Sequence, residues 1–269
     1  MTAWDQFGPD YDFPDFTGQP QSYLIATTPR CGSHHLGHLL CATGMLGSPL
    51  EYFSKGRLRD WQEKLEATSR QDLFQKLFRR RTSPSGWFGV KAHWPQFEQL
   101  ANDPELFPLF NFTRFIHIER RDRIAQAISW VIAQQSAAWI SFHETSEEPT
   151  YDFAAIQNAV AVIDAQTTTW KQFFTSRGIE PLRVVYEDLV TSPEHAVDAV
   201  LTHCGLTRDP AQARETQQPT RQASSRNAAW AERYHRDLAR ASLSEGESGG
   251  WSTGAAHQRS PEGGGASEL

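Results

Sequence analysis

Short apolar runs alternate along this chain with longer stretches in which apolar residues recur every three or four positions. Runs of about four to eight apolar and β-branched residues are typical of buried strands, and the wider spacing is typical of amphipathic helices. The strand pattern fits residues 22–27, 87–92, 113–119 and 182–186. Helical stretches separate these runs, and this order predicts a parallel sheet covered by helices on both faces. The expected fold class is α/β.

The helical stretches carry their own start and stop signals. Asp122 precedes one long amphipathic pattern, and its side chain can cap the free N–H groups there. Another long pattern begins near Phe153 and stops at Gly178. Between the first two strands, the charged residues 56–82 predict one or two helices on the surface, and the run "RRRT" at 79–82 is expected to be a solvated helix end.

The domain organisation follows from length and from a change of composition near the end. A chain of 269 residues is long enough for one α/β domain with a sizeable core, which we assign to residues 1–241. From residue 242 onward Gly and Ser dominate and no apolar period remains, so residues 242–269 are expected to be a disordered tail. The aromatic segment "YDFPDF" near the start is expected to fold over a neighbouring part of the chain or over a partner chain.

Charge and composition narrow the class of protein. A formal net charge of −6 argues against a chain that coats nucleic acid or an anionic membrane surface. Three scattered cysteines are too few for a disulfide framework and favour a reducing compartment. No apolar stretch reaches the ~18 to 20 residues of a membrane span, and the start of the chain is acidic and aromatic, unlike a signal peptide. We expect a cytoplasmic protein without a membrane span.

The turn "TTPRCGSHHL" after the first run has the features of an anion site. N–H groups at a helix N-terminus point at an anion, and the helix dipole favours negative charge there. Pro29 bends the chain, Gly32 lets the backbone approach, Ser33 adds a hydroxyl and Arg30 a fixed positive charge. The lysine of the common ATP-binding loop is missing, which disfavours ATP hydrolysis. On this motif alone, an ordinary strand-to-helix turn is an equally good interpretation.

A second motif strengthens the interpretation as an anion site. In "FIHIERRDRIAQAISW", Arg121 follows the third run and Ser129 comes eight positions later, on the following helix. Ligands of open parallel sheets bind beyond the carboxyl ends of the strands. Two anion sites on adjacent strand ends indicate a nucleotide with phosphates at two separate positions.

These two motifs resemble those of sulfotransferases that use 3′-phosphoadenosine 5′-phosphosulfate (PAPS). "PRCGS" is similar to their "PKSGT"-like turn, and "RDRIAQAIS" is similar to "RNPxDxxxS". Within that superfamily the chain is most similar to the bacterial trehalose 2-sulfotransferase-like family and its lipopolysaccharide sulfotransferase-like relatives. The resemblance spans residues 22–238 and also rests on "GSPLEYF", "GWFGVKAHWPQF", "VVYEDLVTSPE" and "WAERYHRDL". It implies the sulfotransferase fold, a P-loop-like parallel sheet flanked by helices.

The resemblance implies a donor site in two halves. The 5′-phosphosulfate of PAPS would be held by Arg30, Cys31, Gly32, Ser33 and His34, and the 3′-phosphate by Arg121 and Ser129. Arg221 in "PTRQAS" resembles a segment that closes over the nucleotide. The pair of histidines in "GSHHL" departs from the family, whose members commonly have a hydroxyl residue after the Gly-Ser step. A histidine there can donate to a phosphate, and a protonated one would add charge.

The resemblance also implies an acceptor site and a mechanism. Glu51 in "GSPLEYF" would be the general base for the acceptor hydroxyl, and no metal is required. Lys91 and His93 would bind acceptor hydroxyls, with His93 or Lys91 sharing the proton transfer, and Trp94 would stack on a sugar ring. A core role for Trp94 and a satisfied polar role for His93 remain alternatives. So does a metal pair of His34 and His38, four positions apart, although no third ligand stands at a diagnostic spacing.

The sequence therefore predicts an enzyme that moves a sulfuryl group from PAPS to a carbohydrate hydroxyl, with trehalose or a glycolipid sugar as the acceptor. Two alternatives stay open, a non-catalytic nucleotide-binding homologue and, less favoured, a P-loop kinase. The resemblance alone implies a homodimer. The identity of the acceptor does not follow from the nucleotide motifs, because other loops choose it.

Overall fold

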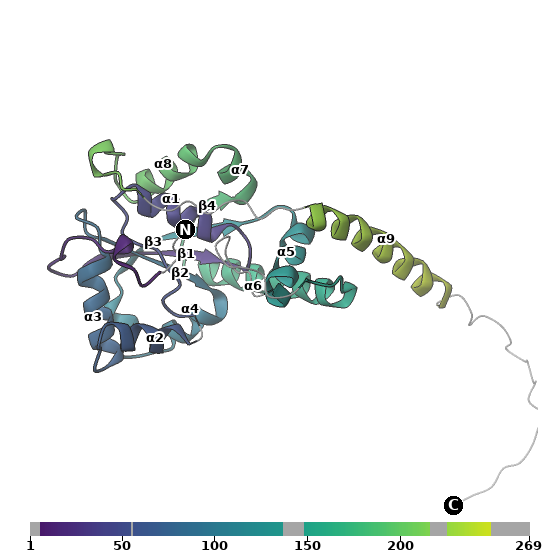
Figure 1. Cartoon of the computed structure of the whole chain (residues 1–269), viewed down its shortest axis with the longest axis horizontal. Helices are drawn as coiled ribbons and strands as arrows, with labels where there is room; N and C mark the ends of the chain where they lie inside the picture. The colour runs from purple at the N-terminus through teal and green to yellow at the C-terminus, as the bar shows by residue number, and fades with distance from the viewer. Residues whose placement is uncertain (1–5, 55, 137–147, 216–224, 249–269) are drawn as a thin grey trace, which may run out of the picture. The chain divides into compact units, whose positions relative to one another are not determined.

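The computed structural model describes residues 6–54, 56–136, 148–215 and 225–248 (Figure 1). The strands are β1 (Gln21–Thr27), β2 (Trp87–His93), β3 (Phe112–Glu119) and β4 (Leu182–Val185). The α-helices are α1 (Ser33–Ala42), α2 (Arg57–Lys64), α3 (Arg70–Arg81), α4 (Trp94–Ala101), α5 (Arg123–Ser136), α6 (Phe153–Ser176), α7 (Tyr186–Thr191), α8 (Pro193–His203) and α9 (Ser225–Ser248). Short 3₁₀ turns cover Pro9–Tyr11, Phe107–Leu109 and Pro210–Gln212.

The four strands form one parallel sheet in the order β2-β1-β3-β4. All four predicted strands are present within one residue of their expected ends, so the α/β prediction is confirmed. From β1 the chain continues to β2 on one side of β1, and it then returns to form β3 on the other side. The direction in which strands are added to the sheet therefore reverses between β1 and β3. The carboxyl ends of β1 and β3 therefore form the switch point at which open α/β sheets bind ligands.

Two hydrophobic clusters cover the two faces of the sheet, and alternate residues of β1 contribute to them because successive side chains of a strand point to opposite faces. Leu24 and Ala26 pack with residues of α3, α4 and α6, whereas Tyr23 and Ile25 pack with residues of α1, α7 and α8. Figure 1 shows α1, α7 and α8 on one side of the strands and α2, α3 and α4 on the other. Trp170 of α6 is fully buried in the first cluster.

The charged stretch between β1 and β2 does form two helices, α2 and α3, but it does not simply lie on the surface. One face of α3 is buried in the core, and Arg81 at its end is only 2% exposed. Its Nε lies 2.8 Å from Oδ1 of Asp12, and its guanidinium lies over the rings of Tyr11 and Trp61. The prediction of a solvated helix end is therefore wrong at Arg81. The N-terminal aromatic segment folds onto its own chain.

The helix signals are confirmed where the structure describes them. The Ala125 N–H donates to Oδ1 of Asp122 at 2.8 Å, which is the expected cap of α5. Helix α9 continues through residues 242–248, where the Gly/Ser-rich tail was expected to begin, and the rest of that tail lies outside the described residues. The chain divides into compact units Met1–Ala231 and Glu232–Leu269, the second of which holds the later part of α9. Among the described helices, none combines the length and apolar character needed to span a membrane.

Candidate functional site

The turn between β1 and α1 lies at the switch point and has an unusual backbone. Arg30 and Gly32 both have positive φ, at 59° and 91°. Gly32 is the N-cap of α1, and a Cβ on it would overlap the ring of Tyr186, the first residue of α7. We expected Gly32 to let the backbone approach an anion. The structure gives an additional reason, because only glycine leaves room for the Tyr186 ring.

A buried glutamine fixes this turn from the neighbouring helix. Gln126 of α5 is fully buried, and its Nε2 donates to Oγ1 of Thr28 at 2.9 Å and to the carbonyl of Pro29 at 2.6 Å. Sequence reasoning missed Gln126. Its position three residues before Ser129, on the same helix face, was the available signal.

The structure brings Arg30 and Ser129 together. The Arg30 Nε donates to Oγ of Ser129 at 3.0 Å, so residues of the two predicted phosphate motifs are in contact. Burial and the nearby Arg120 lower the pKa of Arg30. The Arg120 guanidinium lies over the Tyr186 ring, 4.7 Å from its centroid. Sequence reasoning also missed Arg120 and Tyr186.

Arg121, expected beside Ser129, faces α7 in this structure. Its guanidinium makes a two-pronged contact with the Asp188 carboxylate, with N–O distances of 3.1 and 2.7 Å, and its side chain is 57% exposed. The backbone N–H groups of Arg121 and Asp122 donate to the Glu187 carboxylate at 3.1 and 3.2 Å. The Glu187 carboxylate therefore accepts hydrogen bonds from backbone N–H groups that follow β3. The pairing of Arg121 with Ser129 around a 3′-phosphate stays a prediction, and it requires a rearrangement of these contacts.

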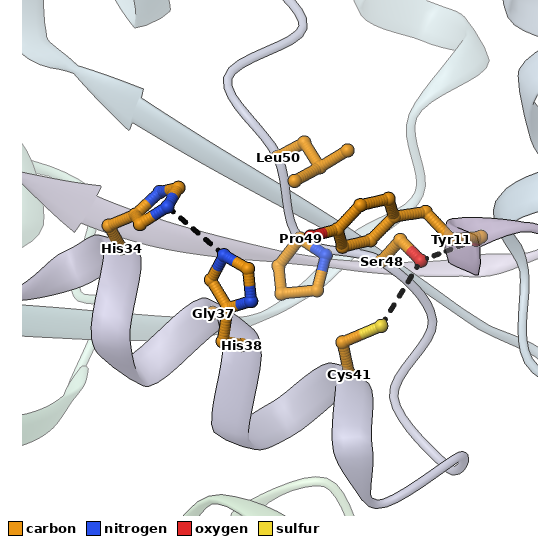
Figure 2. Close-up of a pocket in the computed structure, with 8 residues that line it drawn as sticks. All are labelled: Tyr11, His34, Gly37, His38, Cys41, Ser48, Pro49 and Leu50. Carbon is orange, nitrogen blue, oxygen red and sulfur yellow. Dashed lines mark hydrogen bonds between the residues drawn. The ribbon is translucent and has the colours of Figure 1, made fainter. Parts of the chain in front are cut away.

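Cys31, Ser33 and His34 begin α1 or lie just before it. Cys31 is fully buried, and burial raises the pKa of its thiol. Burial, reinforced by Lys91 and His38, lowers the pKa of His34 to about 2. His34 is therefore neutral near pH 7 in this structure, and its expected contact with the phosphosulfate stays a prediction. Nε2 of His34 lies 3.0 Å from Nε2 of His38 (Figure 2), the distance of a hydrogen bond between two rings.

Glu51 lies close to Lys91 and His93 beside the sheet, and the roles expected of the three residues stay predictions. The bridge between Leu50 and Val90 and the hydrogen bond from Lys91 N–H to the Leu50 carbonyl hold this loop against β2. The Lys91 Nζ lies 3.0 Å from Oε1 of Glu51, and Nε2 of His93 lies 3.9 Å from the same oxygen.

Charge, rather than burial, sets the protonation of Glu51. Burial alone would raise the pKa of Glu51, but Lys91 and then His93 outweigh it, and they hold that pKa well below its usual range. Gln96 of α4 donates to the second carboxylate oxygen at 3.4 Å. Burial lowers the pKa of His93, whose Nδ1 lies 2.6 Å from Oγ1 of Thr27. The site therefore presents an ionised carboxylate beside a buried lysine and a neutral imidazole.

Trp94 and Arg221 are the remaining predicted site residues. The Trp94 ring contacts Trp170 and Phe173, with centroids 5.0 and 5.8 Å apart, so it takes part in core packing. Its stacking on a sugar stays a prediction. Arg221 lies outside the described residues. Among the residues that the structure does describe, no group of three or more metal-ligating side chains is found.

Comparison with known proteins gives the family. The model of the Stf0 sulphotransferase family matches residues 22–237. Trehalose 2-sulfotransferase of Mycolicibacterium smegmatis is 29% identical over 83% of this chain and 98% of its own, and that of Mycobacterium tuberculosis is 27% identical over 82% and 97%.

Among solved structures, the sulfotransferase domain from the curacin biosynthetic pathway is 18% identical, with a TM-score of 0.43 over 73% of this chain and 77% of its own. A likeness this distant carries no argument about the site. The family match is different, because it extends from β1 into α9 and includes the turn, the Glu51 loop and the β3–α5 junction. The expected resemblance is confirmed, and the chain belongs to the Stf0 sulphotransferase family.

Proposed function

We propose that this protein moves the sulfuryl group of PAPS to a carbohydrate hydroxyl, with Glu51 as the general base. The observation that carries the proposal is an ionised carboxylate close to the anion turn. Nδ1 of His93 lies 2.6 Å from Oγ1 of Thr27, the last residue of β1, and Nε2 of His93 lies 3.9 Å from Oε1 of Glu51. The Glu51 carboxylate therefore lies close to the strand end from which the anion turn begins, and this supports one site for the donor and the base. Two relatives are trehalose 2-sulfotransferases, which makes trehalose the first acceptor to test. A glycolipid sugar is the second.

The residues at the turn fit the anionic end of the donor. Arg30 supplies a fixed charge, Ser33 a hydroxyl, and the first N–H groups of α1 point out of the helix at its positive end. Bound PAPS would supply the sulfuryl group. Arg30 and these N–H groups would stabilise the negative charge that grows on the phosphate oxygen as its bond to sulfur breaks, which lowers the barrier selectively.

Glu51 would take the proton of the attacking hydroxyl. As the acceptor oxygen bonds to sulfur, its proton moves to the Glu51 carboxylate, and the bond from sulfur to the donor phosphate breaks. A carboxylate paired with Lys91 is a weak base. Lys91 lies 3.0 Å from the Glu51 carboxylate. An exchange of this contact for one with an incoming sulfuryl oxygen would raise the pKa of Glu51 as the reaction proceeds.

The decisive experiment replaces Glu51 by glutamine, which keeps its size and removes its basicity. Purified parent and Glu51→Gln proteins receive sulfur-labelled PAPS and a panel of sugars and glycolipids that begins with trehalose. Turnover should fall by about 10²- to 10⁴-fold, the usual contribution of a general base. Binding of adenosine 3′,5′-bisphosphate, measured by calorimetry, should stay within a few fold of the parent.

Glu63→Gln is the matched control, because Glu63 is an exposed carboxylate on α2 that pairs with Arg59 one helical turn away. It should turn over at the parent rate. Full turnover by Glu51→Gln would show that the base is assigned wrongly. No transfer by the parent to any acceptor, with intact binding of the bisphosphate, would favour a non-catalytic homologue. Preference for ATP over PAPS would favour a kinase.

Two further parts of the proposal concern the donor and the setting. Calorimetry with adenosine 3′,5′-bisphosphate and with adenosine 5′-phosphate measures what the 3′-phosphate contributes to the affinity, and equal affinities would refute a 3′-phosphate site at Arg121 and Ser129.

The proposed location of the protein is the cytoplasm, a reducing compartment. The free, buried Cys31, Cys41 and Cys204 support it. Dimer formation stays a prediction, which light scattering of the purified protein would test.

A further inference from the structure

Two imidazole rings form a pair on the helix that begins at the anion turn. His34 and His38 are one turn apart on α1 and therefore share a face. Their Nε2 atoms lie 3.0 Å apart, and the ring centroids lie 4.5 Å apart (Figure 2). His38 is 2% exposed, and the edge of its ring meets the Tyr11 ring.

The surroundings leave His34 with a single ring proton. Burial opposes a charged ring, and the repulsion from Lys91, His38 and Arg30 outweighs the attraction of Glu51, so the low pKa leaves the imidazole of His34 neutral at pH 7. A neutral imidazole has one N–H and one lone pair. The contact between the two Nε2 atoms needs one of each, so one ring donates the hydrogen bond and the other accepts it.

The direction of this hydrogen bond determines whether Nδ1 of His34 carries a proton or a lone pair. The two nitrogens of an imidazole point away from each other, and Nε2 of His34 points one turn into the helix, toward His38. If His34 donates to His38, its Nδ1 presents a lone pair, which an anion on the turn repels. If His38 donates, the proton of His34 stays on Nδ1, where an anion can accept it.

We propose that His38 is a positioning residue that, when the donor is bound, donates its Nε2–H to His34 and so holds the His34 proton on Nδ1, aimed at the anionic phosphosulfate end. This role rests on the proposed function, since it needs a donor anion on the turn. Position 34 would then supply a neutral hydrogen-bond donor whose direction is set by a second ring one turn away.

The pocket around His38 keeps the ring in place. Besides the two histidines, its walls are formed by Tyr11, Gly37, Cys41, Ser48, Pro49 and Leu50 (Figure 2). Gly37 lies on the same helix, and a Cβ there would come within 3.0 Å of the Pro49 carbonyl, so the loop packs directly on α1. The His38 ring is buried in this pocket, and its replacement by an apolar residue removes the ring beside Nε2 of His34.

The first test measures affinity for adenosine 3′,5′-bisphosphate by calorimetry. His38→Leu should weaken binding about 10- to 100-fold, the value of one hydrogen bond to a charged group. His38→Gln should stay within about threefold of the parent, because its amide can donate to His34 in the same way. His35→Ala is the matched control, since it removes the next imidazole of the same helix, and it should not change the affinity. Thermal melts show whether each variant is folded.

A double-mutant cycle separates positioning from packing. A serine at position 34 donates through a hydroxyl that rotates freely and needs no tautomer. In the His34→Ser background, His38→Leu should therefore change the affinity less than twofold. An equally large loss in that background would mean that His38 acts through packing alone, and it would overturn the proposal.

Nitrogen-15 NMR observes the tautomer itself. With the bisphosphate bound, His34 of the parent should show the Nδ1–H form, and His38→Leu should shift it to the Nε2–H form. An Nε2–H form in the bound parent would overturn the role of His38, as would equal affinities of the parent and the His38→Leu variant. If the parent itself does not bind the bisphosphate, the proposed function fails, and the role of His38 fails with it.

Discussion

Replacement of Gly32 by alanine tests how the anion turn is held. Gly32 has φ +91°, and a Cβ added there would overlap Cδ2 of the Tyr186 ring and lie 3.0 Å from its Cε2. The ring cannot simply move away, because the Arg120 guanidinium lies over it, 4.7 Å from its centroid. The substitution therefore strains both the backbone and the packing between α1 and α7.

The expected cost has two parts. A non-glycine residue in the left-handed region costs about 1–2 kcal/mol, and overpacking of a filled contact costs about 1–3 kcal/mol more. Gly56 separates them, because it is also a helix N-cap with positive φ, at 84°, and a Cβ on it would meet nothing within 4 Å. Gly56→Ala should show the backbone part only.

Urea unfolding and thermal melts measure both variants against the parent. Gly32→Ala should be less stable than Gly56→Ala by about 1–3 kcal/mol, which corresponds to a melting temperature roughly 2–12 °C lower. In a Tyr186→Ala background, Gly32→Ala should cost only about as much as Gly56→Ala does in the parent, because the added methyl group then has room. Equal stabilities of the two alanine variants would refute the contact between Gly32 and Tyr186.

Three further predictions follow from buried ionisable groups. Asp12→Ala should lower the free energy of unfolding by about 3–5 kcal/mol in urea titrations, because it strands the charge of Arg81, whereas an unchanged midpoint would contradict the ion pair. Lys91→Met should raise the pKa of Glu51 and move the acid limb of the turnover profile roughly 1–3 pH units higher; an unmoved limb would show that Lys91 does not control the base. Burial lowers the pKa of His117 to about 4, so stability should fall by about 3 kcal/mol from pH 6.5 to 4, and His117→Phe should lose this dependence.

The fold could be predicted from the sequence because its strands are short, apolar and separated by clear helical spacing. The run at 22–27 became β1, whose alternate residues pack against helices on opposite faces. The spacing of apolar residues along one helix predicts which of its faces is buried. It cannot show that a segment far away in the chain buries a charged side chain of that helix. Arg81 stands in a run of arginines that is typical of a solvated helix end, and its partner Asp12 lies far away in the chain. Only the folded chain brings the two together.

The sequence could name candidate site residues where a motif resembles that of a known family. Glu51, Lys91 and His93 were named in this way, and in the structure Nζ of Lys91 and Nε2 of His93 lie 3.0 and 3.9 Å from the Glu51 carboxylate, whereas their roles stay predictions. Gln126 and Tyr186 were missed because each acts through contacts with the turn that form only in the folded chain. Gln126 bonds two groups of the turn, and Tyr186 fills the space that a glycine leaves. No local spacing of residues indicates such contacts.

The position of Asp12 also matters for how the protein should be produced. The family match begins at residue 22, so a gene trimmed to that match would omit the carboxylate that neutralises Arg81 and the ring of Tyr11 beside His38. The trimmed polypeptide would leave the Arg81 charge without its partner and would open a cavity where the Tyr11 ring packs. It would be expected to aggregate during expression. Expression of this protein should therefore retain residues 6–21, which the family match does not include.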